Sequence, residues 1–148
     1  MRIASPLIRY VVAFVLVAPA FLAPALAQQT GPVSATDGAA IRKVIEDQIA
    51  AFKREDGVAA FGFASPDIRE TFGSADQFMN MVRSGYQPVY RPRRIEFGAI
   101  EEIEGTPAQH VWVVGPDGED VEAIYYMQRQ PDGSWRINGC DLRRANNA

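Results

Sequence analysis

The chain has 148 residues, with 15 Lys or Arg against 18 Asp or Glu, and its formal net charge at pH 7 is −3. This acidic balance argues against a nucleic-acid-binding protein, which usually carries a clustered basic patch. One cysteine (Cys140) cannot form an internal disulfide, and together with one histidine (His110) it supplies too few ligands for a zinc site. We therefore expect no metal and no cofactor, and we interpret Cys140 as a small buried residue of the last strand.

Residues 1–27 have the pattern of a cleaved secretory signal peptide. Two arginines precede an apolar run that ends in Ala-Leu-Ala, so cleavage is predicted after Ala27. Two prolines interrupt the run, which argues against the alternative of a permanent membrane anchor. The protein is therefore expected in the periplasm or outside the cell, and it meets the membrane only through the signal. Loss of both arginines takes the net charge from −3 to −5.

After the signal we expect a flexible lead over residues 28–36, a single domain over 37–144 and a tail over 145–148. A helix is predicted from Asp37, taken as its N-cap, because Ile41, Ile45, Ile49 and Phe52 recur at helical spacing. A short apolar turn or helix follows around the segment VAAFGFA.

Two further helices are predicted from their end signals. In SPDIRETFG, Ser65 caps a helix with proline at its first position, and Gly73 ends it. In SADQFMNMVRSG, Ser74 and Gln77 form a capping box, and Gly85 is expected to stop the helix.

The second half of the domain alternates with the two-residue period of strands. Strands are predicted near residues 95–99, 109–114, 121–130 and 135–142, and Pro-Asp-Gly turns separate the last three. Short connections make neighbouring strands antiparallel. The order of elements therefore predicts an α+β fold, in which N-terminal helices cover one face of a curved antiparallel sheet of about four strands.

The segment GYQPVYRPRR joins the two halves. Its prolines are expected to keep the backbone extended, so we interpret it as a rigid crossover. Tyr86 and Tyr90 could also form the rim of a pocket. Because the chain is acidic, Arg91, Arg93 and Arg94 are expected to pair internally rather than recognise an acidic partner.

Much of the chain resembles a known family. The segments FASP, Gly-Tyr-x-Pro-Val-Tyr and Trp-x-Ile-x-Gly are similar to those of short bacterial secreted proteins grouped as domain of unknown function 4864. That resemblance implies no activity and no catalytic residues. The architecture is similar to the wider nuclear-transport-factor-2-like superfamily, also called ketosteroid-isomerase-like or SnoaL-like. This wider resemblance implies a cone-shaped, cystatin-like fold with a pocket, in which members are isomerases, dehydratases or hydrolases, or only bind or dimerise.

Strand alternation predicts which residues face the helices. Val111 and Val113 are expected on the inner face, as are residues 121, 123, 125 and 127, and this face includes the Tyr125 hydroxyl. Gln48 is the polar member of the first helix's apolar stripe. We therefore predict a pocket lined near its mouth by Gln48, Tyr86, Tyr90 and Tyr125.

The opposite face of the sheet carries His110, Trp112, Ile124 and Tyr126. Exposed apolar clusters usually mark an interface, so Trp112, Ile124 and Tyr126 are predicted to form a homodimer interface. His110 is interpreted as a surface or interface residue.

These features favour a non-catalytic module that binds a small apolar ligand or interacts with proteins. No carboxylate or imidazole is predicted on the inner face, and proton-transfer enzymes need a positioned base, so no catalytic residue is assigned. Two alternatives stay open: an isomerase-, dehydratase- or hydrolase-like enzyme that uses a pocket tyrosine on a small apolar substrate, and a scaffold without a ligand.

Overall fold

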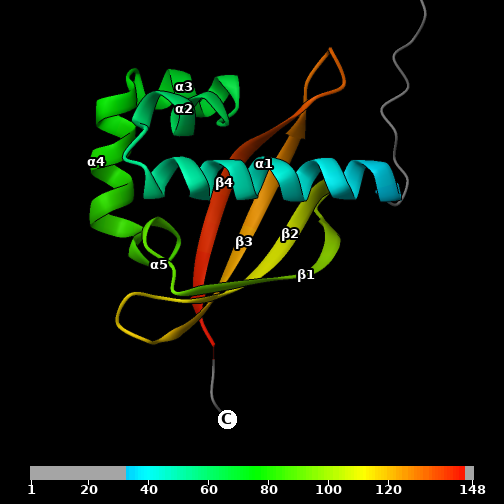
Figure 1. Cartoon of the computed structure of the whole chain (residues 1–148). Helices are drawn as coiled ribbons and strands as arrows, with labels where there is room; N and C mark the ends of the chain where they lie inside the picture. Colours follow the sequence, from blue (N-terminus) through cyan, green and yellow to red (C-terminus); the bar gives the residue numbers. More distant parts are fainter. Residues whose placement is uncertain (1–32, 146–148) are drawn as a thin grey trace, which may run out of the picture.

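The computed structural model describes residues 33–145, in which five helices precede four strands (Figure 1). The helices are α1 (Ala35–Lys53), α2 (Gly57–Gly62), α3 (Pro66–Phe72), α4 (Ala75–Gly85) and α5 (Gln87–Tyr90). The strands are β1 (Arg94–Ile103), β2 (Thr106–Val114), β3 (Asp120–Arg129) and β4 (Trp135–Arg144). The predicted signal peptide and most of the predicted lead lie outside the described residues.

The four strands form one antiparallel sheet in the order β1-β2-β3-β4, and each strand pairs with its neighbour in sequence. Helix α1 lies across the sheet, while α2, α3 and α4 gather at one end of it (Figure 1). The predicted α+β fold, with helices before an antiparallel sheet, is confirmed.

Helix α1 begins earlier than the sequence pattern indicated. Its N-cap is Ser34, whose Oγ accepts a hydrogen bond from the backbone N–H of Asp37 at 3.1 Å. Asp37 instead lies in the first helical turn, where its carboxylate accepts hydrogen bonds from Ser34 Oγ and Trp135 Nε1. The assignment of Asp37 as the cap was therefore wrong, because a serine three residues upstream makes the reciprocal contact.

The next helices begin as predicted. Ser65 Oγ accepts from the N–H of Ile68, and Ser74 Oγ accepts from the N–H of Gln77. Gly73 ends α3 in the left-handed region, with φ of 73°. Gly85 differs from its prediction, because it is the last residue of α4 rather than a left-handed stop beyond it.

The crossover after Gly85 is helical, not extended. Residues 87–90 form the single turn α5, with Pro88 at its second position, where the fixed φ of proline suits a helix. The N–H of Tyr90 donates to the carbonyl of Tyr86, and that of Arg91 donates to the carbonyl of Gln87. This turn sends the side chains of Tyr86 and Tyr90 to different parts of the molecule.

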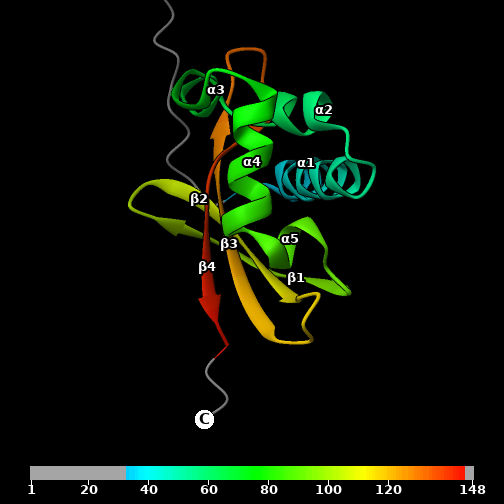
Figure 2. The ribbon, with the colours of Figure 1, turned by 90° about the vertical axis from the view of Figure 1, so that its left-hand side faces the viewer.

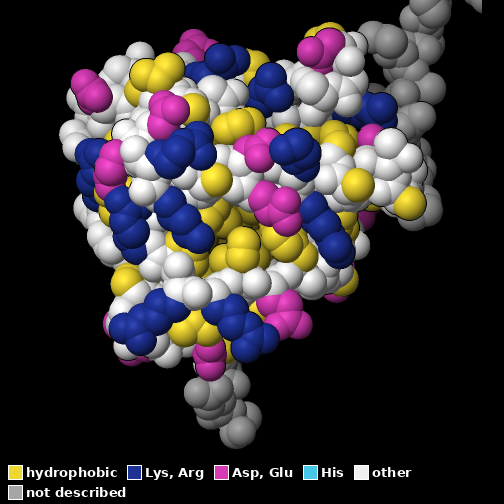
Figure 3. Space-filling model, in the orientation of Figure 1, with side chains coloured by type: hydrophobic (Ala, Val, Ile, Leu, Met, Phe, Trp, Pro, Cys, Tyr) yellow, Lys and Arg dark blue, Asp and Glu magenta, His cyan; other side chains and the backbone are white. Residues whose placement is uncertain are grey.

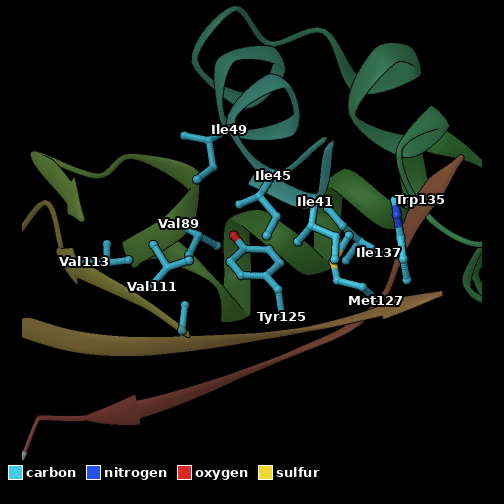
Figure 4. Packing of buried hydrophobic residues seen from close by; sticks show 11 residues of the cluster. Ile41, Ile45, Ile49, Val89, Val111, Val113, Tyr125, Met127, Trp135 and Ile137 are labelled. Carbon is cyan, nitrogen blue, oxygen red and sulfur yellow. The ribbon is translucent and has the colours of Figure 1, made fainter. Parts of the chain in front are cut away.

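The core consists of two clusters. The first lies between α1 and the inner face of the sheet, where Ile41, Ile45 and Ile49 face Val111 and Tyr125 (Figure 4). The second lies among the helices and includes Ala51, Phe52, Ala60, Phe78, Met79, Val82 and Tyr90. The predicted inner face of β2 and β3 is confirmed, since Val111, Val113, Val121, Ala123, Tyr125 and Met127 are all buried.

Apolar side chains remain visible on the side of the molecule that α1 crosses. Figure 3 shows them below α1, with Lys, Arg, Asp and Glu side chains around them. Val44, Ile95 and Phe97 are partly buried and pack against the first cluster, and the guanidinium of Arg42 lies 5.7 Å from the centre of the Phe97 ring. Arginine thus covers part of the apolar edge between α1 and β1.

Candidate functional site

A cavity of about 300 Å³ separates α4 from the sheet. Figure 1 shows α4 at the left, on the side of the sheet where β4 lies, and Figure 2 shows α4 in front of the strands. The lining residues that are buried are Gln48, Phe52, Ala64, Phe78, Val82, Val89, Tyr125 and Ile137. The lining residues that are partly exposed are Ile68, Phe72, Met81, Tyr86, Gly139 and Cys140. The partly exposed residues form the rim, and the buried residues form the walls and floor.

The cavity exists because the two core clusters do not merge. Phe52, Phe78 and Val82 belong to the helical cluster, whereas Val89 and Tyr125 belong to the cluster on the sheet. Both sets line the cavity. A space between two packed clusters is therefore surrounded almost entirely by apolar atoms, which is the usual character of a site for a small molecule.

Gln48 occupies one wall of this cavity, as the sequence suggested. Its side chain is 3% exposed, and its Nε2 donates to the carbonyl of Ala60 at 3.1 Å. The amide therefore ties α1 to α2. In the described part of the chain no hydrogen bond to its Oε1 is formed, so this oxygen remains free to accept one.

Tyr86 also lines the cavity, at its rim. Its hydroxyl donates to the carbonyl of Cys140 at 3.1 Å, which links the junction of α4 and α5 to β4. Burial, followed by electrostatic interaction with Cys140 and Asp141, raises the pKa of Tyr86 above its usual value. The hydroxyl is therefore neutral, and its hydrogen is already used in the bond to the Cys140 carbonyl.

Tyr125 lies on the floor and is 1% exposed. Its hydroxyl has no hydrogen-bond partner of normal geometry among the described residues, although it lies close enough to the Cys140 thiol for the two groups to influence each other. Burial, followed by Cys140, holds the pKa of Tyr125 well above its usual range. Burial, followed by Asp141, likewise raises the pKa of the Cys140 thiol. Both groups are therefore neutral.

Tyr90, the fourth predicted pocket residue, lies elsewhere. Its ring packs against Phe52 in the helical cluster, and its hydroxyl hydrogen-bonds to the carboxylate of Glu55. Glu55 also contacts Arg91 and, at 3.0 Å, Arg83. Tyr90 thus anchors α5 to the end of α1. Sequence reasoning placed it with Tyr86 because it assumed an extended segment rather than a helical turn.

The predicted dimer residues do share the outer face, but they differ in exposure. Trp112 is 46% exposed, and Tyr126 is partly buried with its hydroxyl 3.0 Å from Asp141 Oδ2. Ile124 is fully buried within a single chain, between its cross-strand neighbours His110 and Asp141. The expectation that Ile124 forms part of an exposed cluster was therefore wrong.

The outer face also holds a cluster of His110 with two glutamates that sequence reasoning missed. His110 Nδ1 lies 2.6 Å from Glu122 Oε1, and His110 Nε2 lies 3.4 Å from Glu101 Oε2. The turn before β3 could have revealed it, because pairing of His110 with Ile124 makes Glu122 a diagonal neighbour on the same face. The cluster lies on the opposite side of the sheet from the cavity, so this imidazole cannot act as a base there.

Residues 33–145 form neither a metal-binding cluster nor a membrane-spanning helix. These residues contain no group of three or more His, Cys, Asp or Glu side chains that could hold a metal ion. None of the helices formed by this part of the chain is long and apolar enough to cross a membrane.

Comparison with known proteins gives one match. The family model described as Domain of unknown function (DUF4864) matches residues 34–148. No curated protein matches the chain, and no solved structure does. Because the family match includes every helix and strand described above, the protein belongs to the DUF4864 family.

Proposed function

We propose that the protein is an exported binding protein that holds a small apolar molecule in the cavity between α4 and the sheet. The observation that carries this proposal is the cavity itself, about 300 Å³ in volume and lined by aliphatic and aromatic side chains with only a few polar groups. Sites for small ligands usually combine an apolar lining with a few polar anchors, and their volumes begin at about 300 Å³. Gln48 Oε1 and the Tyr125 hydroxyl are the two anchors with hydrogen-bonding capacity left.

The catalytic alternative receives less support from the same residues. The lining residues include no carboxylate and no imidazole. A tyrosine that acts as a general acid near neutral pH needs a lowered pKa, whereas burial raises the pKa of both Tyr86 and Tyr125. Turnover of a bound molecule would overturn our preference for binding over catalysis.

Export and superfamily placement are part of the proposal. Export rests on the signal pattern of residues 1–27, with cleavage after Ala27. Membership of the nuclear-transport-factor-2-like superfamily rests on the arrangement of helices over one face of an antiparallel sheet, with a cavity between the layers. Fold analogy alone does not assign a function.

We also propose a homodimer through the outer face of the sheet, centred on Trp112. Beside this exposed ring lies a hollow of about 250 Å³ that is lined in part by Arg94, Glu96 and Val114. In a two-fold dimer the same patch meets itself, so a protruding ring next to a hollow is self-complementary. Because the cavity opens on the other side of the sheet, such a dimer would leave the ligand site free.

A thermal-shift screen of the purified protein against small lipophilic molecules tests ligand binding. A ligand at 100 times its dissociation constant adds about 2.7 kcal/mol to the free energy of unfolding, so a true ligand raises Tm measurably. A broad library of apolar molecules that leaves Tm unchanged would contradict the proposal.

A matched pair of variants places the site. Met81 is a partly exposed rim residue, so Met81→Trp should block the cavity and abolish the ligand-induced Tm shift. Val58 is 79% exposed on α2 and does not line the cavity, so Val58→Trp adds the same side chain without blocking it. A ligand that still stabilises Met81→Trp as strongly as the unmodified protein binds elsewhere.

A further inference from the structure

The floor of the cavity carries a hydroxyl, that of Tyr125, whose described polar interaction is with the weakly accepting Cys140 thiol and not with an oxygen or nitrogen atom. The Tyr125 side chain is 1% exposed, and its hydroxyl forms no hydrogen bond of normal geometry within residues 33–145. Figure 4 shows the hydroxyl turned away from the sheet toward Ile45 and Val89, and Val89 lines the cavity. Buried polar groups are nearly always satisfied, and leaving one unsatisfied is unfavourable. The Tyr125 hydroxyl is therefore prepared to donate to an acceptor brought by a ligand.

The walls provide nothing to neutralise a charge on that ligand. No Lys, Arg, His, Asp or Glu lines the cavity. The nearby polar groups of Tyr86, Tyr125 and Cys140 are neutral, because burial raises the pKa of each. Asp141 contributes to the raised pKa values of Tyr86 and Cys140, so the charged side chain with a described effect on these two groups is negative. A carboxylate would lose its hydration here without gaining a counter-ion.

We propose that the cavity selects an uncharged amphiphile, whose small terminal oxygen accepts a hydrogen bond from the Tyr125 hydroxyl, over the carboxylate of the same chain length. This inference rests on the proposed binding function and adds the chemical class of the ligand. The Tyr125 oxygen has almost no exposed surface, so an acceptor reaches it only when the side chains that cover it move aside, and only a small polar end fits there. The remainder of the ligand lies against the apolar walls.

The size of the cavity sets the size of suitable probes. A water molecule occupies about 30 Å³ in the liquid, so a cavity of about 300 Å³ has room for on the order of ten non-hydrogen atoms. The neutral ketone 2-octanone and the anion octanoate both have this size. They present the same kind of alkyl chain with an uncharged or a charged polar end.

Calorimetric titration of the purified protein with these two probes at neutral pH tests the inference. We expect 2-octanone to bind at least about tenfold more tightly than octanoate, because only octanoate must bury a charge. Tyr125→Phe should weaken 2-octanone binding by about three- to tenfold through loss of one neutral hydrogen bond. It should leave Tm unchanged or higher, since it removes only an unsatisfied hydroxyl.

Tyr126→Phe is the matched control. It removes a hydroxyl from the next residue of the same strand, but that hydroxyl bonds to Asp141 on the outer face. Affinity for both probes should therefore be unchanged in this variant. If Tyr126→Phe weakens binding as much as Tyr125→Phe does, the hydroxyl of Tyr125 has no specific role.

The contrary outcomes are distinct. Octanoate binding as tightly as 2-octanone would overturn the selection for an uncharged ligand. Unchanged 2-octanone affinity in Tyr125→Phe would show that the hydroxyl does not bind the ligand. It would then be expected to donate to Gln109 Oε1, because Gln109 is the cross-strand partner of Tyr125 and this oxygen is also buried without a partner. If neither probe binds while another lipophilic molecule does, this inference fails and the proposed function stands. If nothing binds, both fail.

Discussion

At the scale of single residues, Glu55 connects more of the molecule than any sequence motif suggested. Its carboxylate accepts from the Tyr90 hydroxyl and contacts both Arg83 and Arg91, although its own backbone has a φ of 58°. A positive φ is unfavourable for a residue with a side chain. The contacts with α4 and with the α5 segment offset that strain.

Glu55→Gln should lower Tm at neutral pH, with the difference disappearing in acid. The hydrogen bond from Tyr90, followed by that from Arg83, holds the pKa of Glu55 below its ordinary value of 4.5. A carboxyl whose pKa is lowered on folding stabilises the fold above the unfolded-state pKa, and that contribution is lost as pH falls through the folded pKa. We therefore expect the gap in Tm to be full near pH 7 and to close by about pH 3.

Thermal unfolding followed by circular dichroism across this pH range measures the gap. Asp47→Asn is the control, because the Lys43–Asp47 pair is exposed on one face of α1 and contributes at most about 0.5 kcal/mol. A gap for Glu55→Gln that stays constant from pH 7 to pH 3 would show that shape, rather than charge, makes this residue important.

At the scale of elements, the two glycines that end helices have different roles. Gly73 has a φ of 73° beyond α3, so a side chain at this position is strained even though nothing lies near its Cβ position. Gly73→Ala should cost about 1–2 kcal/mol. Gly85 lies within α4 without a positive φ and also has open space, so Gly85→Ala should be neutral or stabilise by up to about 1 kcal/mol. Urea unfolding of both variants measures their free energies of unfolding. Equal losses of stability in the two variants would contradict the assignment of Gly85 to the helix.

Of the three serine caps, Ser65 and Ser74 differ because only Ser65 also joins its helix to the sheet. Ser65 is fully buried, and its Oγ both caps α3 and donates to Asn138 Oδ1 of β4 at 2.6 Å. Ser74 Oγ only caps α4. Ser65→Ala should therefore cost about 2 kcal/mol and Ser74→Ala about 1 kcal/mol in urea unfolding. Equal costs would mean that the bond to Asn138 contributes nothing to stability.

The features that the sequence predicts correctly are those that depend on residues close together in the chain. Helix caps and stops depend on residues three or four apart, so the pattern predicts the roles of Ser65, Ser74 and Gly73. Strand faces alternate, so the pattern also predicts that Tyr125 lies on the inner face of the sheet. The contact between Glu55 and Tyr90 spans 35 residues and depends on α5 being helical, so no local pattern indicated it. Burial of Ile124 depends on its cross-strand neighbours, which alternation alone does not describe.

At the scale of the whole molecule, the sheet separates two surfaces. Its inner face forms the first core cluster and the floor of the cavity, where Tyr125 lies. Its outer face carries Trp112 and the contacts of His110 with Glu101 and Glu122. A ligand and a second copy of the chain would therefore use opposite faces, so dimerisation and ligand binding are expected to be independent of each other.

Trp112→Glu should convert the proposed dimer into a monomer. The ring is 46% exposed in the single chain, so burying it between two copies is favourable, whereas two carboxylates meeting near a two-fold axis would repel each other. Sedimentation velocity at micromolar concentration should show a dimer for the unmodified protein and a monomer for this variant. The surface position limits the expected loss of monomer stability to about 0.5–1 kcal/mol.

Val58→Glu provides the comparison, because Val58 is the other large hydrophobic residue exposed in the described part of the chain and lies on α2, away from the sheet. It places the same charge on the surface and should leave the dimer intact. If the unmodified protein sediments as a monomer at tens of micromolar, the dimer does not exist. If Trp112→Glu remains dimeric while Val58→Glu dissociates, the copies meet through the helices, and the open side of the cavity beside α4 would then lie near the interface instead of facing away from it.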